Sequence, residues 1–86
     1  MDGISERERL RDLLGEVLAK TTHYRGYLGD ELDFLADLGL DSMNLGRLVM
    51  ELEERLDLFL QDLPEGPPRT IGELLDAILS LREQPQ

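Results

Sequence analysis

Leucine dominates the apolar residues of this chain, and its spacing constrains the fold. Twenty of the 86 residues are leucine, whereas valine and isoleucine together number five. Leucine loses little rotamer freedom in a helix, whereas β-branched residues favour strands. In three segments the apolar residues recur every three or four positions, which is typical of one face of a helix. These three stripes are Leu10, Leu13, Leu14, Val17 and Leu18; Leu45, Leu48, Val49, Leu52 and Leu56; and Ile71, Leu74, Leu75, Ile78 and Leu79.

Capping residues mark where each of these helices begins. The first and last start with the S/T-x-x-E pattern that satisfies free amides at a helix N-terminus, at Ser5 to Glu8 and at Thr70 to Glu73. Asp41 or Ser42 supplies the N-cap of the middle helix. We therefore predict helices over residues 5 to about 19, 42 to about 56 and 71 to about 82.

The segments between these helices complete the predicted fold. Residues 21–41 form a long first connection that three glycines interrupt but that is too apolar for a free loop. We expect it to lie across the helices with a helical turn near residues 30–36, anchored by Phe34, Leu35 and Leu38. Residues 58–63 are expected to form a short helix that ends at Pro64. The prediction is one domain over residues 1–86, an all-α four-helix bundle with three long helices and one short helix.

The charge of the chain restricts its partners. Nine basic residues against nineteen acidic ones give a net charge of −10. Such a chain is unsuited to a nucleic-acid backbone or an anionic membrane surface, and it favours partners with basic patches. Residues 30–62 hold ten acidic and two basic side chains. The chain has no cysteine, no apolar run long enough to span a membrane and no signal-peptide pattern, so we expect a cytoplasmic monomer.

The residue inventory argues against an enzyme. His23 is the single histidine, and without cysteine the chain lacks the groups for Ser/His or Cys/His catalysis or for a zinc site. A calcium loop that starts at Asp33 would place Leu35 and Leu38 where an oxygen ligand and a glycine are needed. We therefore predict no catalytic residue and no metal site.

One serine occupies a position suited to modification. Ser42 begins the middle helix, where the macrodipole and free amides favour a phosphate attached to its hydroxyl. Asp41 could help to hold a divalent cation against an incoming diphosphate, and Gly39 permits a sharp turn into the helix. The simple alternative is that Asp41 and Ser42 are an ordinary capping pair.

The sequence around this serine resembles the acyl and peptidyl carrier proteins. The resemblance rests on D-L-G-L-D-S-M at residues 37–43 with L-V-M-E-L-E-E-R-L-D at residues 48–57, on F-L-A-D-L-G at 34–39, and on T-I-G-E-L at 70–74. It is weaker over residues 5–21 and absent over 22–29. The resemblance implies an acyl-carrier-protein-like bundle in which Ser42 bears a 4′-phosphopantetheine arm and Asp41 is its neighbour in the family motif.

The resemblance also implies a docking surface on the middle helix. Contacts with partner enzymes are expected from Met43, Arg47, Met50, Glu51 and Glu54. The alternatives are a core methionine at Met43 and a merely solvated face for the glutamates. Two positions depart from the fatty-acid members: Gly46 replaces a common β-branched residue, and Arg47 replaces a common acidic one.

Two functional hypotheses follow. In the first, the chain is a discrete carrier that a phosphopantetheinyl transferase loads from coenzyme A and that holds acyl or aminoacyl groups as thioesters for loading and downstream enzymes. Gly46 and Arg47 favour polyketide or nonribosomal peptide synthesis over fatty-acid synthesis. In the second hypothesis, the chain is an unmodified acidic adaptor that binds a basic partner protein.

Overall fold

The protein is an all-α domain, and the computed structural model describes residues 5–22, 24–60 and 68–83. Three helices lie in this part of the chain: α1 at Glu6–Thr21, α2 at Ser42–Leu56 and α3 at Ile71–Glu83. No strand occurs among the described residues, where the β-type pairing is one isolated bridge between Asp33 and Thr70. The all-α prediction is confirmed, and the predicted bounds of all three helices agree with the structure to within about two residues.

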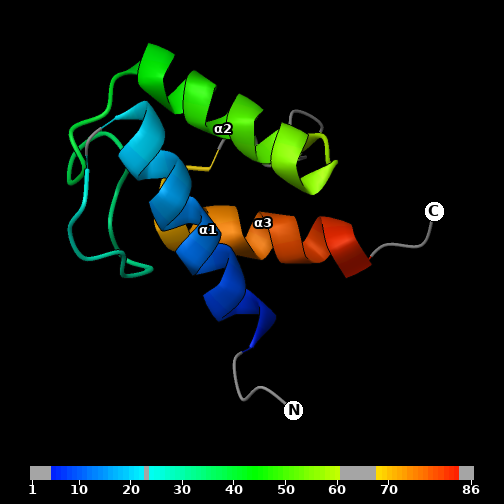
Figure 1. Ribbon diagram of the computed structural model, residues 1–86. Helices are drawn as coiled ribbons and strands as arrows, with labels where there is room; N and C mark the ends of the chain where they lie inside the picture. Colours follow the sequence, from blue (N-terminus) through cyan, green and yellow to red (C-terminus); the bar gives the residue numbers. More distant parts are fainter. Residues whose placement is uncertain (1–4, 23, 61–67, 84–86) are drawn as a thin grey trace.

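The three helices bury the predicted stripes against one another. α1 packs against both α2 and α3, and the long connection runs along one side of the molecule (Figure 1). Each helix contributes leucine or isoleucine to one core that also contains Phe34 and Leu40 from the connection. The core residues are Leu10, Leu14, Val17, Leu18, Phe34, Leu40, Leu48, Leu52, Leu60, Ile71, Leu74, Leu75 and Ile78.

The helix starts carry the expected caps, with one difference. The Ser5 hydroxyl accepts a hydrogen bond from the Glu8 amide at 3.2 Å, and the Thr70 hydroxyl accepts one from the Glu73 amide at 3.1 Å. The Glu73 carboxylate accepts from the Arg69 amide at 2.9 Å, one residue before the position that the S/T-x-x-E pattern implies. This carboxylate therefore satisfies a donor in the segment that leads into α3.

Hydrogen bonds fasten the first connection to the start of α3. The Phe34 amide donates to the Arg69 carbonyl at 2.9 Å, and the Gly72 amide donates to the Asp30 carbonyl at 3.0 Å. The Asp30 carboxylate also accepts from Arg7 at 2.8 Å and lies 2.7 Å from an Arg11 nitrogen. The connection is thus held along this path, although its described residues form no helix.

Two details of the connection differ from the prediction. Phe34 is buried and Leu38 packs against the core, as expected, but Leu35 is 49% exposed and the prediction that it is an anchor was wrong. Leu40, which was not predicted as an anchor, is buried instead. The expected helical turn is a single turn in which the Asp37 amide donates to the Asp33 carbonyl at 2.9 Å.

The expected short helix at residues 58–63 stays a prediction. Leu58 and Phe59 are not helical, and Leu60 has 3₁₀ geometry. The remainder of that segment lies outside the described residues, as does His23. Among the helices of the described residues, none has the length and apolar character needed to cross a membrane.

Candidate functional site

The candidate site is the N-terminus of α2, and Asp41 is the residue that creates it. Asp41 has extended backbone geometry, and its carboxylate accepts a hydrogen bond from the Asn44 amide at 2.7 Å. Its carbonyl accepts the first helical hydrogen bond, from the Leu45 amide at 2.9 Å. Asp41 is therefore the N-cap, and Ser42 is the first residue of the helix. This resolves which of the two predicted residues caps α2.

The approach to this cap is built by a turn that brings the chain sharply into the helix. Gly39 has a φ of 75°, in the left-handed region that glycine adopts at no steric cost. The buried Leu40 follows, and its amide donates to the Phe34 carbonyl at 3.0 Å. The chain is therefore fixed on both sides of the turn, and Asp41 and Ser42 emerge at the surface.

A carboxylate pair shapes the turn that precedes Gly39. The Asp33 carboxylate accepts from the Leu35 and Ala36 amides at 2.8 and 2.9 Å, and the Asp37 carboxylate accepts from the Asp33 amide at 2.7 Å. The hydrogen bonds from the Ala36 and then the Leu35 amide, with the Arg69 charge as a further cause, hold the pKa of Asp33 below its ordinary value. Asp37, the first residue of the D-L-G-L-D-S-M motif, thus has a structural role.

The Ser42 side chain is exposed and stands at the positive end of the α2 dipole. The first turn of α2 contains no acidic residue, so Asp41 is the carboxylate nearest to the free amides. Among the described residues, no side chain or backbone group is hydrogen-bonded to the Ser42 hydroxyl. The hydroxyl is therefore accessible, and an attached phosphate would meet a favourable potential.

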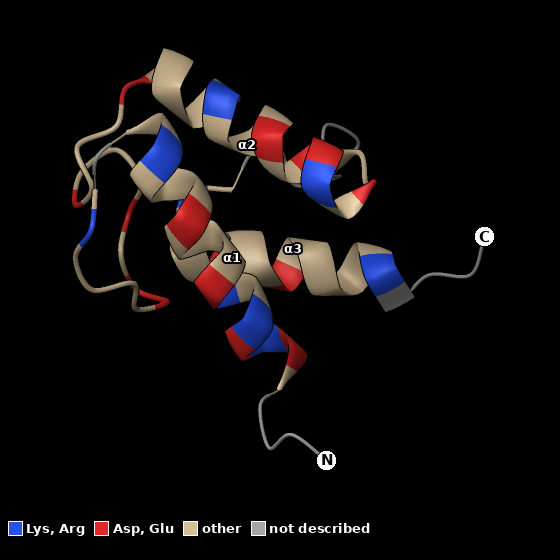
Figure 2. Cartoon of the chain, viewed as in Figure 1, with Lys and Arg blue, Asp and Glu red and all other residues tan. Residues whose placement is uncertain are grey.

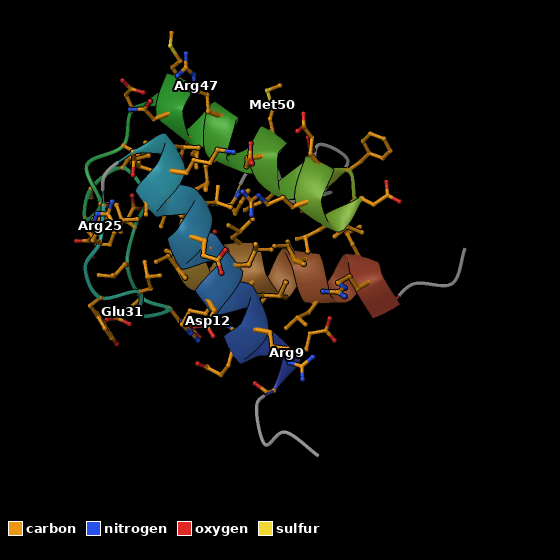
Figure 3. All side chains as sticks on the ribbon, viewed as in Figure 1. Arg9, Asp12, Arg25, Glu31, Arg47 and Met50 are labelled. Atoms are coloured by element: carbon orange, nitrogen blue, oxygen red, sulfur yellow. The ribbon has the colours of Figure 1, made fainter. Side chains whose placement is uncertain are left out.

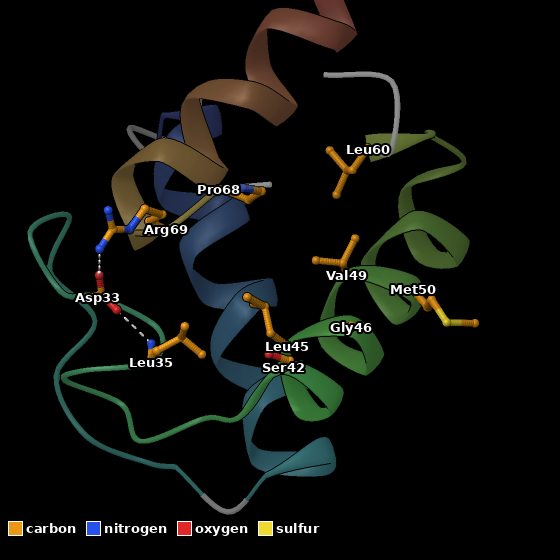
Figure 4. Close-up of a pocket in the computed structure, with 10 residues that line it drawn as sticks. All are labelled: Asp33, Leu35, Ser42, Leu45, Gly46, Val49, Met50, Leu60, Pro68 and Arg69. Carbon is orange, nitrogen blue, oxygen red and sulfur yellow. Dashed lines mark hydrogen bonds and ion pairs between the residues drawn. The ribbon is translucent and has the colours of Figure 1, made fainter. Parts of the chain in front are cut away.

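A groove of about 800 Å³ opens beside Ser42 (Figure 4). One wall is α2, and the other is formed by the first connection and the segment that leads into α3. Most of its lining is apolar, and Ser42 is part of that lining. The lining residues are Asp33, Leu35, Ser42, Leu45, Gly46, Val49, Met50, Leu60, Pro68 and Arg69. The groove leaves no signal in the sequence, because its two walls meet only in the folded chain.

The predicted partner-binding residues fall into two groups. Met43 and Met50 are 70% and 58% exposed, and Arg47 and Glu54 are exposed as well. Glu51 is half-buried, and its carboxylate accepts from Lys20 at 3.2 Å and from Arg55 at 3.0 Å. These hydrogen bonds, that of Arg55 first, hold the pKa of Glu51 below its ordinary value. The site thus brings five predicted residues together at the surface, whereas Glu51 also joins α2 to α1.

These features define a class of domain. A small helical unit that exposes a serine at a helix N-terminus, beside an apolar groove, presents a hydroxyl to other proteins. No group of three or more His, Cys, Asp or Glu side chains among the described residues could hold a metal ion.

Comparison with known proteins identifies the family. The family model described as "Phosphopantetheine attachment site" matches residues 8–78. An acyl carrier protein from Clostridium perfringens is 31% identical over 74 residues, which cover 85% of this chain and 97% of the relative. An acyl carrier protein from Trieres chinensis is 38% identical over 48 residues, 56% of this chain and 60% of the relative.

The chain belongs to the phosphopantetheine-binding carrier proteins, as the sequence motifs predicted. These proteins carry a covalent 4′-phosphopantetheine group and are carriers, not catalysts. They interact with phosphopantetheinyl transferases and with biosynthetic enzymes. The residues present fit the group, because an exposed hydroxyl, free helix amides and an adjoining groove occur together at Ser42.

Proposed function

We propose that this chain is a discrete carrier protein whose 4′-phosphopantetheine arm is attached to the hydroxyl of Ser42. The arm supplies a terminal thiol, on which acyl or aminoacyl groups are held as thioesters. The observation that carries the proposal is the exposure of Ser42 at the first position of α2, inside the segment that the family model matches. A cytoplasmic location, a monomeric state and a single domain over residues 1–86 stay predictions.

The chain's own residues contribute position and electrostatics. A transferase would join the Ser42 oxygen to the phosphorus of coenzyme A's pantetheine phosphate and release adenosine 3′,5′-bisphosphate. The Ser42 proton would pass to a base of the transferase. The free amides of the first turn of α2 would face the new phosphodiester, and the Asp41 cap would keep the turn in place. The groove beside Ser42 offers apolar contact to the part of the arm or cargo that lies against α2.

The pathway is proposed from the two departures on α2. Arg47 is exposed on the face expected to meet partner enzymes, where its positive charge repels the basic surfaces that bind acidic carriers. Gly46 leaves open space at the groove, because a Cβ atom there would meet no described residue within 4 Å. Both features favour polyketide or nonribosomal peptide synthesis over fatty-acid synthesis. The relatives are named acyl carrier proteins and do not distinguish these pathways.

The experiment is incubation of the folded protein with a promiscuous phosphopantetheinyl transferase and coenzyme A, followed by intact-mass measurement. The wild type should gain one phosphopantetheine group. Ser42→Ala should gain none, and Ser80→Ala, which changes an exposed serine of α3, should behave as the wild type. Circular dichroism should show equal helix content in all three proteins.

Two results would overturn the proposal. If the folded wild type gains no mass, the chain is not a carrier, and the unmodified acidic adaptor becomes the better hypothesis. If Ser42→Ala still gains one group, the attachment point is a different residue.

A further inference from the structure

The exposed face of α2 carries a continuous stripe of unlike side chains. Met43, Arg47, Met50 and Glu54 are spaced by four, three and four residues, which places them within about 60° of one another around the helix. All four are exposed, and the buried Leu48 and Leu52 lie on the opposite side. Figure 3 shows Arg47 and Met50 pointing away from the body of the protein. These four residues are called the α2 stripe below.

The charges of the α2 stripe are available for contacts outside the chain. Among the described residues, none forms an ion pair or hydrogen bond with the side chain of Arg47 or Glu54. The neighbouring acids differ, because Glu51 is paired with Lys20 and Arg55, and the Glu53 carboxylate accepts from the Leu60 amide at 2.8 Å. The stripe therefore presents one unpaired cation nearer to Ser42 and one unpaired anion farther from it.

The α2 stripe lies within reach of any protein that acts at Ser42. A protein–protein interface of ordinary size covers about 800 Å² on each partner, which corresponds to a disc about 16 Å in radius. At a rise of about 1.5 Å per residue, the stripe extends about 16 Å from Met43 to Glu54. Because Met43 adjoins Ser42, an interface centred on that serine covers the first three residues of the stripe. Glu54 is about 18 Å from Ser42 along the axis and lies at the rim of such an interface. Figure 2 shows basic and acidic residues along α2.

The side chains of the stripe specify the chemistry of a partner. Two methionines, each more than half exposed, offer flexible apolar contacts that fill irregular pockets. Arg47 lies between them in the sequence, and its charge disfavours binding to a partner whose surface is uniformly basic. Glu54 follows Arg47 by seven residues, or about 10 Å along the axis.

We propose that the α2 stripe docks a partner protein that presents a carboxylate to Arg47, apolar pockets to Met43 and Met50, and a basic side chain to Glu54. The order of charges fixes the direction in which this partner lies along α2, with its acidic residue nearer to Ser42. This inference rests on the proposed function, because it assumes that partners approach Ser42. It adds that Arg47 selects against partners whose docking surface is basic throughout.

The test uses a phosphopantetheinyl transferase whose surface beside the active site is basic, and a variant of it with one acidic residue in place of the basic residue that faces position 47. The measured quantity is kcat/KM for modification, at low salt and at 0.5 M salt. The carrier variants are Arg47→Glu and Arg25→Glu. They change the net charge equally, but Arg25 is an exposed residue of the first connection, away from α2 (Figure 3).

With the basic transferase at low salt, Arg47→Glu should raise kcat/KM about threefold to tenfold more than Arg25→Glu does, because it removes a local repulsion. The transferase with the acidic residue should reverse this preference and favour the wild-type carrier. Both differences should shrink at 0.5 M salt, where surface charges are screened. Met50→Ala should lower kcat/KM at both salt concentrations, because its contact is apolar.

Equal behaviour of Arg47→Glu and Arg25→Glu with both transferases would overturn the proposal, since position 47 would then lie outside the interface. A wild-type carrier that is modified normally in that experiment leaves the proposed function intact. A wild type that no transferase modifies refutes the proposed function, and this inference with it.

Discussion

Replacing Gly46 with alanine should stabilise the protein, although this glycine lies in the middle of a helix next to the groove. Among the described residues, a Cβ atom at position 46 would meet nothing within 4 Å, so alanine fits there without strain. Glycine in a helix interior is less favourable than alanine by about 0.5–1 kcal/mol, chiefly because its unfolded chain has more freedom to lose. Because the added methyl group makes no new contact, the whole gain should come from the backbone.

The expected gain converts into a measurable change of melting temperature. An unfolding entropy of about 2.1 cal/mol/K per residue gives about 0.18 kcal/mol/K for a chain of this length, so Gly46→Ala should raise Tm by about 3–6 °C. The assay is thermal unfolding of the unmodified protein followed by circular dichroism, with urea unfolding as a check. Gly39→Ala is the matched control: its φ of 75° disfavours alanine by about 1–2 kcal/mol and should lower Tm. A Gly46→Ala protein no more stable than the wild type would refute this reasoning.

Two further changes test other parts of the structure. Asp41→Ala removes the carboxylate that accepts from the Asn44 amide and should cost about 1 kcal/mol in urea unfolding, whereas Asp41→Asn should restore most of it; equal losses in both variants would contradict the capping role. The hydrogen bonds from Arg7 and then Arg11 hold the pKa of Asp30 below its ordinary value of 3.8. A carboxylate whose pKa is lowered by folding stabilises the fold at pH values above its ordinary pKa. This stabilisation is lost as the pH falls through the pKa of the folded state, so the urea concentration at the unfolding midpoint should decrease when the pH is below 4. Asp30→Asn should drop less between pH 7 and pH 3, and an identical drop would assign the acid sensitivity to other groups.

The helices were predictable because their signals are local. The spacing of leucines gave the buried faces, and capping residues gave the starts of α2 and α3. The end of α1 was predicted less accurately, because the helix continues to Thr21. The Thr21 and Thr22 hydroxyls donate to the Val17 and Leu18 carbonyls, each at 2.8 Å. Such side-chain hydrogen bonds leave no periodic pattern in the sequence.

The first connection shows where local signals fail. Leu35 and Leu40 are equally apolar, yet Leu35 is exposed at the groove and Leu40 is buried. One signal could have found Leu40, since an apolar residue just before an N-cap often packs against the fourth residue of the helix, here Leu45. The exposure of Leu35 depends on the turn that Asp33 and Asp37 build, and on the hydrogen bond from the neighbouring Phe34 amide to the Arg69 carbonyl.

The acidic residues around Ser42 also show what the sequence alone cannot predict, namely which carboxylates stabilise the fold. Residues 30–62 hold ten acidic side chains, and a count alone assigns them all to docking. Nine of the ten belong to the part of the chain that the structure describes, and six of these accept hydrogen bonds that hold the fold together: Asp30, Asp33, Asp37, Asp41, Glu51 and Glu53. A carboxylate that accepts from an amide keeps its charge, so it still contributes to the long-range field that attracts basic partners.

Short-range selection by α2 must come from side chains that can reorganise to meet a partner. Glu51 is separated from Met50 by a rotation of about 100°, which turns it toward Lys20 of α1 and away from the α2 stripe. Arg47 and Glu54 lack such internal partners among the described residues. In the docking that we propose, the acidic field would bring a partner to this surface, and the order of Arg47 and Glu54 along α2 would select the partners that fit.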